Sequence, residues 1–136
     1  MISVASQYAL RAMASLASSA NEEPVLARTL STTLGIPHHY LSKLMLDMTK
    51  AGLLKSNRGR GGGYRLALPA KEIPLVDVVE IFDGIKARPA CLLEVDRICS
   101  DDNSCSAHES FKKVRQLYIE FLESTTIADI KKPPNL

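Results

Sequence analysis

Three cysteines and one histidine form the only cluster of soft metal ligands in this chain. Cys91, Cys99 and Cys105 are its only cysteines, and His108 follows the last of them by three positions. Thiolate and imidazole are the ligands that zinc and iron favour, so the four side chains could close a four-coordinate site. The alternative is three buried or idle thiols, but cysteines scattered by chance would rarely share one polar segment.

Length and composition predict one compact unit with a protruding element, since the chain has 136 residues. The apolar N-terminal stretch carries Arg11 in its middle and has helical spacing, so we expect a core helix there rather than an export signal. No segment approaches the roughly 18 uncharged apolar residues of a membrane span. An odd number of cysteines in a chain without an expected export signal argues against a disulfide framework and for a reducing cytoplasm.

The net charge of +2 hides a strongly basic segment. Residues 36–71 carry seven lysines and arginines against one aspartate, a local balance of +6 that leaves about −4 for the remainder. Neutralisation of phosphates supplies most non-specific affinity for nucleic acid. A solvated lysine-rich surface is the alternative, so the charge alone decides little.

Three helices are predicted around this segment. Apolar residues recur at helical spacing over residues 4–18 and again over 26–34, where Gly35 can terminate the second helix. Pro37 suits the first turn of a third helix that runs to about Ala51, with Gly52 as its stop. Two short helices joined by a tight glycine-containing turn predict a helix-turn-helix.

The third helix separates an apolar stripe from a polar, basic side. The predicted stripe consists of Tyr40, Leu41, Leu44, Met45 and Met48. His38 and His39 could be ordinary surface histidines at a helix start. Alternatively, they lie with Ser42 and Lys43 near bases or phosphates, because the first turns of a recognition helix enter the major groove.

A hairpin with a basic tip is predicted next, over residues 53–69. Tyr64, Leu66 and Leu68 alternate with other residues at the period of a half-buried strand. The tip, residues 57–63, combines Arg58 and Arg60 with four glycines, so it can approach DNA closely while arginine enters a minor groove. We interpret it as a wing, the alternative being a flexible surface loop.

Residues 108–124 predict a long amphipathic helix with a rich apolar face. The apolar residues at this spacing are Ala107, directly before the segment, and Phe111, Val114, Leu117, Tyr118, Phe121 and Leu122 within it. Part of it must pack on its own domain, and the rest favours pairing with a second copy in a two-fold dimer on a palindromic site. The tail, residues 131–136, has no packing pattern and is expected to be frayed.

The order of these segments resembles a known family. SQYALRAM, GIPHHYLSKLM, KAGLL, RGRGGGYRLALPAKEI and VDVVEIFDG, followed by the cysteine loop, are similar to the Rrf-two (Rrf2) family of bacterial winged-helix regulators over residues 1 to about 130. The resemblance implies a homodimeric repressor or activator that binds double-stranded DNA. It also implies an iron-sulfur cluster that controls which operators the dimer holds.

The resemblance also implies roles for individual residues. Arg58 matches the wing arginine that enters the minor groove, and residues 37–43 match the base-reading start of the recognition helix. Ser42 stands where the family's cluster-assembly regulators tend to have an acidic residue, which leaves the operator sequence open. The candidate DNA contacts are Pro37, His38, His39, Tyr40, Ser42, Lys43, Lys50, Arg58 and Arg60.

The cluster ligands follow from the same resemblance. His108 falls where the cluster-assembly regulators have their fourth ligand, after three cysteines in a loop whose first gap is longer here. The nitric-oxide sensors of the family use an acidic residue of the partner's first helix instead, and Gln7 at that position is a poor iron ligand. A two-iron, two-sulfur cluster is favoured, with a four-iron cluster second. Asp101 and Asp102 are expected to be solvated rather than ligating.

The sequence thus predicts a mainly α fold with a small β-wing. Its expected parts are a winged helix-turn-helix (1–84), a cluster loop (85–107), a dimerisation helix (108–130) and the tail. Ordering the loop around a cluster could fix the angle between two recognition helices. A structural zinc or a metal-free thiol switch are the alternative functions. An enzyme is not expected, because no nucleophile-base pair, GxxxxGK or HExxH motif is present.

Overall fold

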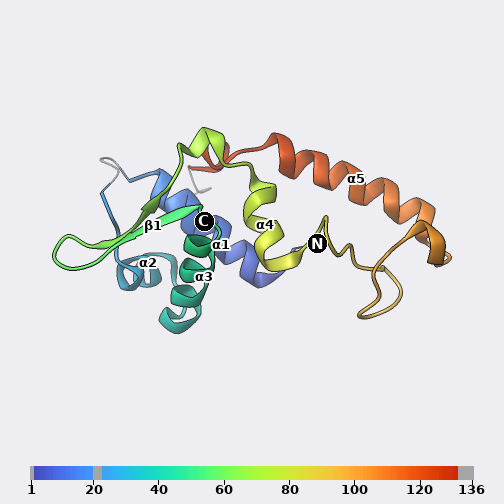
Figure 1. Cartoon of the computed structure of the whole chain (residues 1–136), viewed down its shortest axis with the longest axis horizontal. Helices are drawn as coiled ribbons and strands as arrows, with labels where there is room; N and C mark the ends of the chain where they lie inside the picture. Colours follow the sequence, from blue (N-terminus) through green and yellow to red (C-terminus); the bar gives the residue numbers. More distant parts are fainter. Residues whose placement is uncertain (1, 20–22, 132–136) are drawn as a thin grey trace.

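The computed structural model describes residues 2–19 and 23–131 (Figure 1). Three helices are followed by a small hairpin and then by further helices. The N-terminal part comprises α1 (Val4–Ala17), α2 (Ala27–Leu34), α3 (His38–Lys50), β1 (Leu54–Asn57) and β2 (Gly63–Leu66). The C-terminal part comprises the 3-10 turn η1 (Ala70–Glu72), α4 (Leu75–Asp83), η2 (Asp101–Asn103), α5 (His108–Ser124) and η3 (Ile127–Ile130). The predicted mainly α fold with a β-wing is confirmed.

Local sequence signals fix the ends of the first helices. The hydroxyl of Ser3 caps α1 by accepting the backbone N–H of Ser6 at 3.1 Å. Gly35 ends α2 in the left-handed conformation, with φ of 67°, where a side chain is disfavoured. Pro37 directly precedes α3, so the turn between the two helices is short, and α3 packs against α2.

The wing is a two-stranded antiparallel hairpin in which Leu54 pairs with Leu66 and Asn57 with Gly63. Val25 adds an isolated bridge to Tyr64, with two backbone hydrogen bonds of 2.8 Å. A Cβ atom on Gly63 would lie 2.5 Å from the carbonyl of Val25. A glycine is therefore required where the wing meets the segment between α1 and α2.

A single hydrophobic core joins α1, α2, α3, the base of the wing and α4. Leu41, Met45 and Met48 supply the buried side of α3, as the apolar stripe predicted. Tyr40 does not: its side chain is 41% exposed and packs edge-to-face on Tyr8. The next residue, Leu41, is fully buried, so the rotation of the helix between the two positions carries the Tyr40 side chain to the edge of the core.

The core also takes in residues from the end of the chain. Leu122 of α5 and Ile127 of η3 are fully buried in it, and the Ile127 N–H donates to the carbonyl of Ile73 at 2.9 Å. From this anchor α5 extends away from the winged domain, and the loop that precedes it lies at the far end of the molecule (Figure 1). Residues 132–136 of the predicted tail lie outside the described residues.

Candidate metal centre and nucleic-acid interface

The cysteine loop is shaped by a small backbone ladder. The Cys91 N–H donates to the carbonyl of Arg97 at 3.0 Å, and the Cys99 N–H donates to the carbonyl of Pro89 at 2.7 Å. These hydrogen bonds fold residues 89–99 back on themselves. Two cysteines that are eight positions apart in the sequence are thereby held on facing segments.

A tight turn brings the third cysteine to the histidine. The backbone N–H of His108 donates to the carbonyl of Cys105 at 3.1 Å, so α5 begins directly after the loop. His108 is only 4% exposed, and its Nδ1 lies 3.2 Å from the Sγ of Cys99. Burial at the start of α5 therefore fixes an imidazole beside a thiol.

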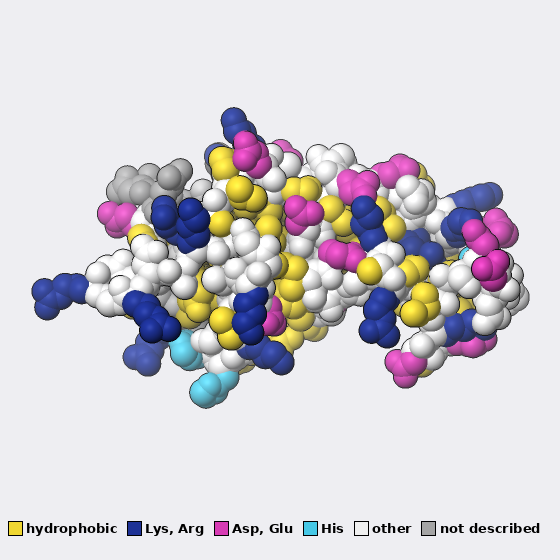
Figure 2. Space-filling view, in the orientation of Figure 1, with side chains coloured by type: hydrophobic (Ala, Val, Ile, Leu, Met, Phe, Trp, Pro, Cys, Tyr) yellow, Lys and Arg dark blue, Asp and Glu magenta, His cyan; other side chains and the backbone are white. Residues whose placement is uncertain are grey.

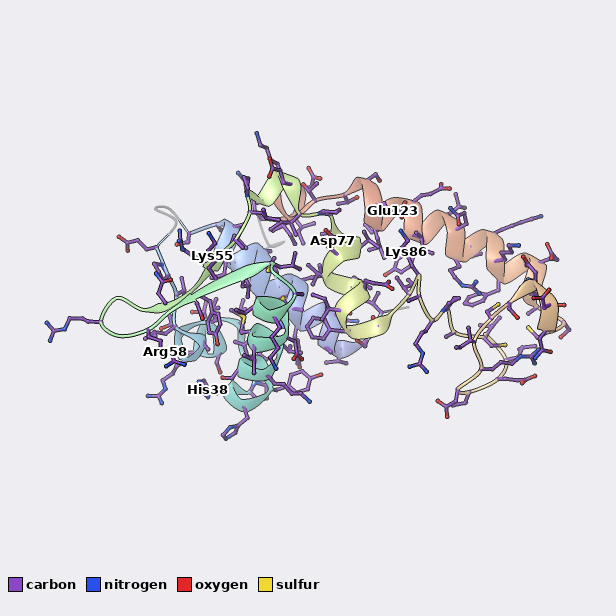
Figure 3. The ribbon with its side chains drawn as sticks, viewed as in Figure 1. His38, Lys55, Arg58, Asp77, Lys86 and Glu123 are labelled. Atoms are coloured by element: carbon purple, nitrogen blue, oxygen red, sulfur yellow. The ribbon has the colours of Figure 1, made fainter. Side chains whose placement is uncertain are left out.

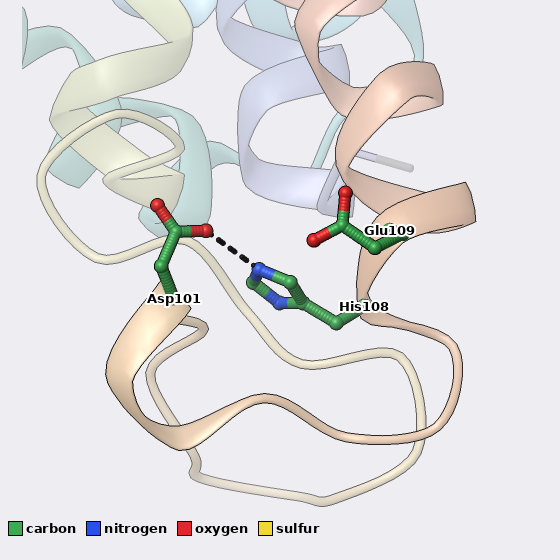
Figure 4. Close-up of side chains that lie close together, drawn as sticks. All are labelled: Asp101, His108 and Glu109. Carbon is green, nitrogen blue, oxygen red and sulfur yellow. Dashed lines mark hydrogen bonds and ion pairs between the residues drawn. The ribbon is translucent and has the colours of Figure 1, made fainter.

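The other ring nitrogen of His108 faces a carboxylate. Its Nε2–H donates to Oδ1 of Asp101 at 2.8 Å (Figure 4). The same oxygen accepts from Nζ of Lys112 at 2.7 Å. The Lys112 ammonium and the His108 ring together lower the pKa of the Asp101 carboxyl, and Asp101 in turn raises the pKa of Lys112. With the ring proton on Nε2, the lone pair of Nδ1 is directed to the thiol side.

The structure adds two partners to the solvated Asp101 that the sequence predicts. Its side chain is exposed, as predicted, but one carboxylate oxygen is bound to His108 and Lys112 rather than only to water. No periodic signal links positions 101 and 108, because they lie on different elements. Lys112 could have been found, since it follows His108 by four positions and so shares its helix face.

Cys91 lies among groups that favour its thiolate. The backbone of Leu93 lowers the pKa of the Cys91 thiol, and the backbone of Glu94, the side chain of Cys105 and the charge of Arg97 act in the same direction, against desolvation. A lowered thiol pKa increases the fraction of thiolate, which is the form that binds metals. The surroundings of Cys91 thus suit a metal ligand.

The four predicted ligands come together in two pairs. Cys99 lies beside His108, and Cys105 lies close enough to Cys91 to affect its pKa. Among the described residues, the group whose ligand atoms all lie within 4.8 Å of one another is Asp101, His108 and Glu109, not the three cysteines. The loop thus presents two ligand pairs rather than one closed tetrahedral set.

Arg97, which the sequence analysis did not single out, holds the loop together. Its guanidinium donates to the carboxylate of Glu94 and to the backbone carbonyl of Asn103. These bonds connect the segment after Cys91 with the turn η2. An arginine in a polar loop without periodicity carries no sequence signal for such a role.

The start of α3 presents an exposed polar surface. Pro37, His38, His39 and Lys43 are exposed and Ser42 is half-buried, with its hydroxyl 3.5 Å from Nε2 of His38. Histidine side chains and many of the lysine and arginine side chains gather at this end of the molecule in the space-filling view (Figure 2). The predicted base-reading residues therefore share one accessible surface.

The wing lies at the same end of the molecule. Arg58 and Arg60 are exposed in its tip. Figure 3 shows Arg58 and His38 toward the same end of the molecule, and Lys86 and Glu123, at the base of α5, far from them. Lys50 is exposed too, but it lies in the last turn of α3, roughly 18 Å along the helix from His38. The structure thus separates Lys50 from the other candidates of the recognition helix.

The projecting helix α5 leaves an apolar face uncovered in the single chain. Val114, Leu117 and Phe121 are 51%, 68% and 51% exposed. They follow one another at spacings of three and four residues, so they lie on one side of the helix. None of the described helices is both long and apolar enough to cross a membrane.

Comparisons with known proteins agree with this architecture. The family model Rrf2, described as an iron-dependent transcriptional regulator, matches residues 2–133. A putative HTH-type regulator of Rhodobacter capsulatus, named rrf2-like, is 31% identical over 96% of this chain and 91% of its own length.

Two solved structures share the fold over nearly the whole chain. The global cysteine regulator CymR of B. subtilis has a TM-score of 0.81 and 29% identity, with 99% of this chain and 98% of CymR covered. IscR of T. potens has a TM-score of 0.75 and 30% identity, with 97% and 86% covered.

Proposed function

The chain belongs to the Rrf2 family of helix-turn-helix transcription regulators, and we propose that it senses the state of an iron-sulfur cluster and represses transcription as a homodimer on palindromic operators. Its relatives are named as regulators, so it is not an enzyme, as the sequence predicted. The observation that carries the proposed sensing is the buried His108, which has a thiol on one ring nitrogen and a carboxylate on the other.

The donor set fits an iron-sulfur cluster. Metal-binding histidines almost always donate their second ring N–H to a carboxylate, carbonyl or water, which fixes the ring and its tautomer. His108 has this arrangement through Asp101, with Nδ1 left for the metal. Cys91, Cys99 and Cys105 are half-buried free thiols, accessible to an incoming cluster yet sheltered from bulk solvent.

The pairing of the ligands favours two irons over one zinc ion. A structural zinc takes its four ligands in one tetrahedron, whereas a two-iron cluster with four protein ligands distributes them over two metal ions. The pairs Cys99 with His108 and Cys91 with Cys105 suit the second case. When bound, such a cluster supplies an iron centre that reacts with oxidants or nitric oxide.

DNA binding is assigned to the end of the molecule opposite the loop. The first turns of α3 would enter the major groove with His38, His39 and Lys43, while Arg58 and Arg60 approach the minor groove beside it. The Ser42 hydroxyl is uncharged and can either donate or accept a hydrogen bond. It therefore discriminates less between DNA bases than a carboxylate would, because a carboxylate only accepts.

The dimer is assigned to the uncovered side of α5. Pairing of Leu117 and its neighbours around a two-fold axis would bury their exposed apolar surface and place two α3 helices on one operator. Single apolar side chains on a surface need no explanation, but a continuous stripe along a projecting helix does.

Coupling between the loop and the DNA would pass through the base of α5. Nζ of Lys86, at the start of the loop, donates to Glu123 near the end of α5 at 2.8 Å. Glu80 of α4 accepts the backbone N–H groups of Lys86 and Ala87, both at 2.9 Å. Ordering of the loop would therefore act on the junction between α5 and the winged domain.

Spectroscopy of anaerobically purified protein tests the sensing. We expect red-brown protein with visible absorption, stoichiometric iron and sulfide, and a line shape that identifies the cluster. His108→Ala and Cys99→Ala should lose or alter the signal, while Ser104→Ala, in the same loop, should keep it. Colourless wild-type protein with stoichiometric zinc would overturn the cluster assignment.

Operator binding tests the assignment of the wing. Arg58→Ala should weaken binding by about 1–3 kcal/mol and reduce its salt dependence, because an arginine contact is lost. Lys71→Ala removes an equally exposed charge outside the proposed surface and serves as the control. Equal effects of both variants in fluorescence anisotropy would contradict the assignment of the wing.

A comparison of operator affinity between cluster-bound and cluster-free dimers tests the coupling. Equal operator affinity of the two forms would refute it.

A metal-free thiol switch is the second candidate. The proximity of Cys105 to Cys91, with the lowered pKa of the Cys91 thiol, favours it, as does the likeness to a cysteine regulator. An oxidant such as peroxide would take two electrons from the two thiols to form a disulfide, with loss of both protons. Mass spectrometry of colourless, oxidised protein would then show a Cys91–Cys105 disulfide, which cluster-loaded protein cannot form.

A further inference from the structure

We propose that Asp101 and Lys112 are positioning residues that act through His108 to set how strongly this imidazole holds iron. The inference rests on the proposed cluster and goes beyond it, because neither residue is one of the four ligands. Asp101 makes the His108 imidazole a stronger electron donor to iron, and Lys112 reduces that effect.

One oxygen atom, Oδ1 of Asp101, contacts both His108 and Lys112. Oδ1 of Asp101 accepts from Nε2 of His108 at 2.8 Å and from Nζ of Lys112 at 2.7 Å. The ring itself is almost fully buried, whereas Asp101 and Lys112 have 69% and 49% exposed side chains. The network thus connects a sheltered ligand to two groups that solvent can reach.

Asp101 fixes both the tautomer and the orientation of the ring. A carboxylate can only accept here, so the ring proton is held on Nε2 and Nδ1 keeps its lone pair toward Cys99. A hydrogen bond to a carboxylate also makes the imidazole a stronger electron donor. Stronger donation stabilises the oxidised form of a cluster more than the reduced form, which lowers its reduction potential.

Lys112 opposes this effect from the same helix. It follows His108 by one turn of α5, so its ammonium reaches the oxygen that the ring uses. By sharing that oxygen it withdraws negative charge from the hydrogen bond to His108. Removing Lys112 should therefore strengthen the donation of His108, and removing the charge of Asp101 should weaken it.

Glu109 is the other carboxylate near the ring. Its ligand atom lies within 4.8 Å of those of Asp101 and His108, and no hydrogen bond to either is present among the described residues. Its charge acts only through space, so Glu109→Gln should move the potential less than Asp101→Asn does.

The test compares reduction potentials of cluster-loaded variants in pairs with the same change of charge. Asp101→Asn should raise the potential and Lys112→Met should lower it. Asp102→Asn and Lys113→Met make the same charge changes at neighbouring exposed positions and should move it much less. A tenfold change in the relative stability of the two oxidation states corresponds to about 59 mV for a one-electron couple.

Two further measurements separate positioning from general charge. In the Asp101→Asn background, Lys112→Met should lose most of its effect, because its acceptor has lost its charge. Loss of the cluster to a chelator should become roughly 10–100 times faster in Asp101→Ala, and the nitrogen hyperfine coupling of the bound histidine in the reduced protein should change. Asp101→Glu should restore part of both.

The outcomes are distinguishable. Wild-type protein without iron overturns the proposed function itself. Wild-type protein that holds a cluster, with Asp101→Asn and Lys112→Met indistinguishable from their neighbouring controls, overturns only the role of these two residues. Opposite shifts that the controls do not share support it.

Discussion

The winged domain and the cysteine loop of this chain are stabilised in different ways. The winged domain has a continuous core to which α1, α2, α3 and α4 all contribute. The loop, residues 85–107, has no buried residue along its whole length, and Leu93 and Val95 are largely exposed on it. Backbone hydrogen bonds and Arg97 hold its path instead.

The difference shows where a signal can act. A packed core resists small changes, because each displacement loses many contacts at once. A loop held by a few exposed hydrogen bonds can become ordered or disordered with a small change in free energy. The proposed sensing chemistry at the loop is therefore compatible with DNA recognition by a stably folded winged domain in one small chain.

The largest expected effect concerns the core. Met45→Ala, at a fully buried position of α3, should lower the free energy of unfolding by about 2–5 kcal/mol through lost burial and a residual cavity. Leu93→Ala in the loop should change it by less than about 0.5 kcal/mol. Urea unfolding at one protein concentration measures both. Similar losses would remove the proposed distinction between the two regions.

The next effect concerns the apolar face of α5. Leu117→Asp should abolish dimerisation, since each subunit would lose about 1.5–3 kcal/mol of apolar burial. The winged domain should stay folded, because Leu117 lies outside its core. Analytical ultracentrifugation with circular dichroism measures both properties, and Gln116→Asp, on the adjacent polar surface, is the control. A dimeric Leu117→Asp variant would contradict the assigned interface.

Removal of iron from the proposed cluster should increase the difference in stability between the two regions. Amide hydrogen exchange in residues 85–107 should accelerate on the order of tenfold or more in chelator-treated protein, because no residue of the loop is fully buried. Exchange in α1 and α3 should not change. Mass spectrometry of peptides from both forms gives the comparison, and acceleration throughout the winged domain would show that its folding depends on the metal.

The smallest expected effect concerns the turn η3, which packs on the winged domain near the end of the chain. Asp129 accepts from the backbone N–H of Thr126 at 2.8 Å and from its hydroxyl at 3.0 Å, and these bonds lower the pKa of Asp129. Its stabilisation is therefore present above the ordinary carboxyl pKa and is lost as the pH falls through the lowered value. The thermal midpoints of wild type and Asp129→Asn should differ slightly at pH 7 and converge in acid. A difference that persists in acid would contradict this role.

Much of the winged domain could be predicted from local sequence. The third helix was expected between Pro37 and Ala51 and spans His38–Lys50, because a proline and a helical apolar period mark it. The wing followed from alternation and glycines. Its pairing with Val25 was missed, since that residue lies far away in sequence and a single bridge leaves no pattern.

The sequence by itself determined the element types and the candidate ligands, because helical period, strand alternation and the chemistry of thiols and imidazole are local properties. It could not determine which ligands become neighbours. Only the tertiary structure set Cys99 beside His108 and Asp101 on the opposite side of the ring. Those positions depend on the path of a loop without periodicity, which is fixed by hydrogen bonds between residues that the sequence keeps apart.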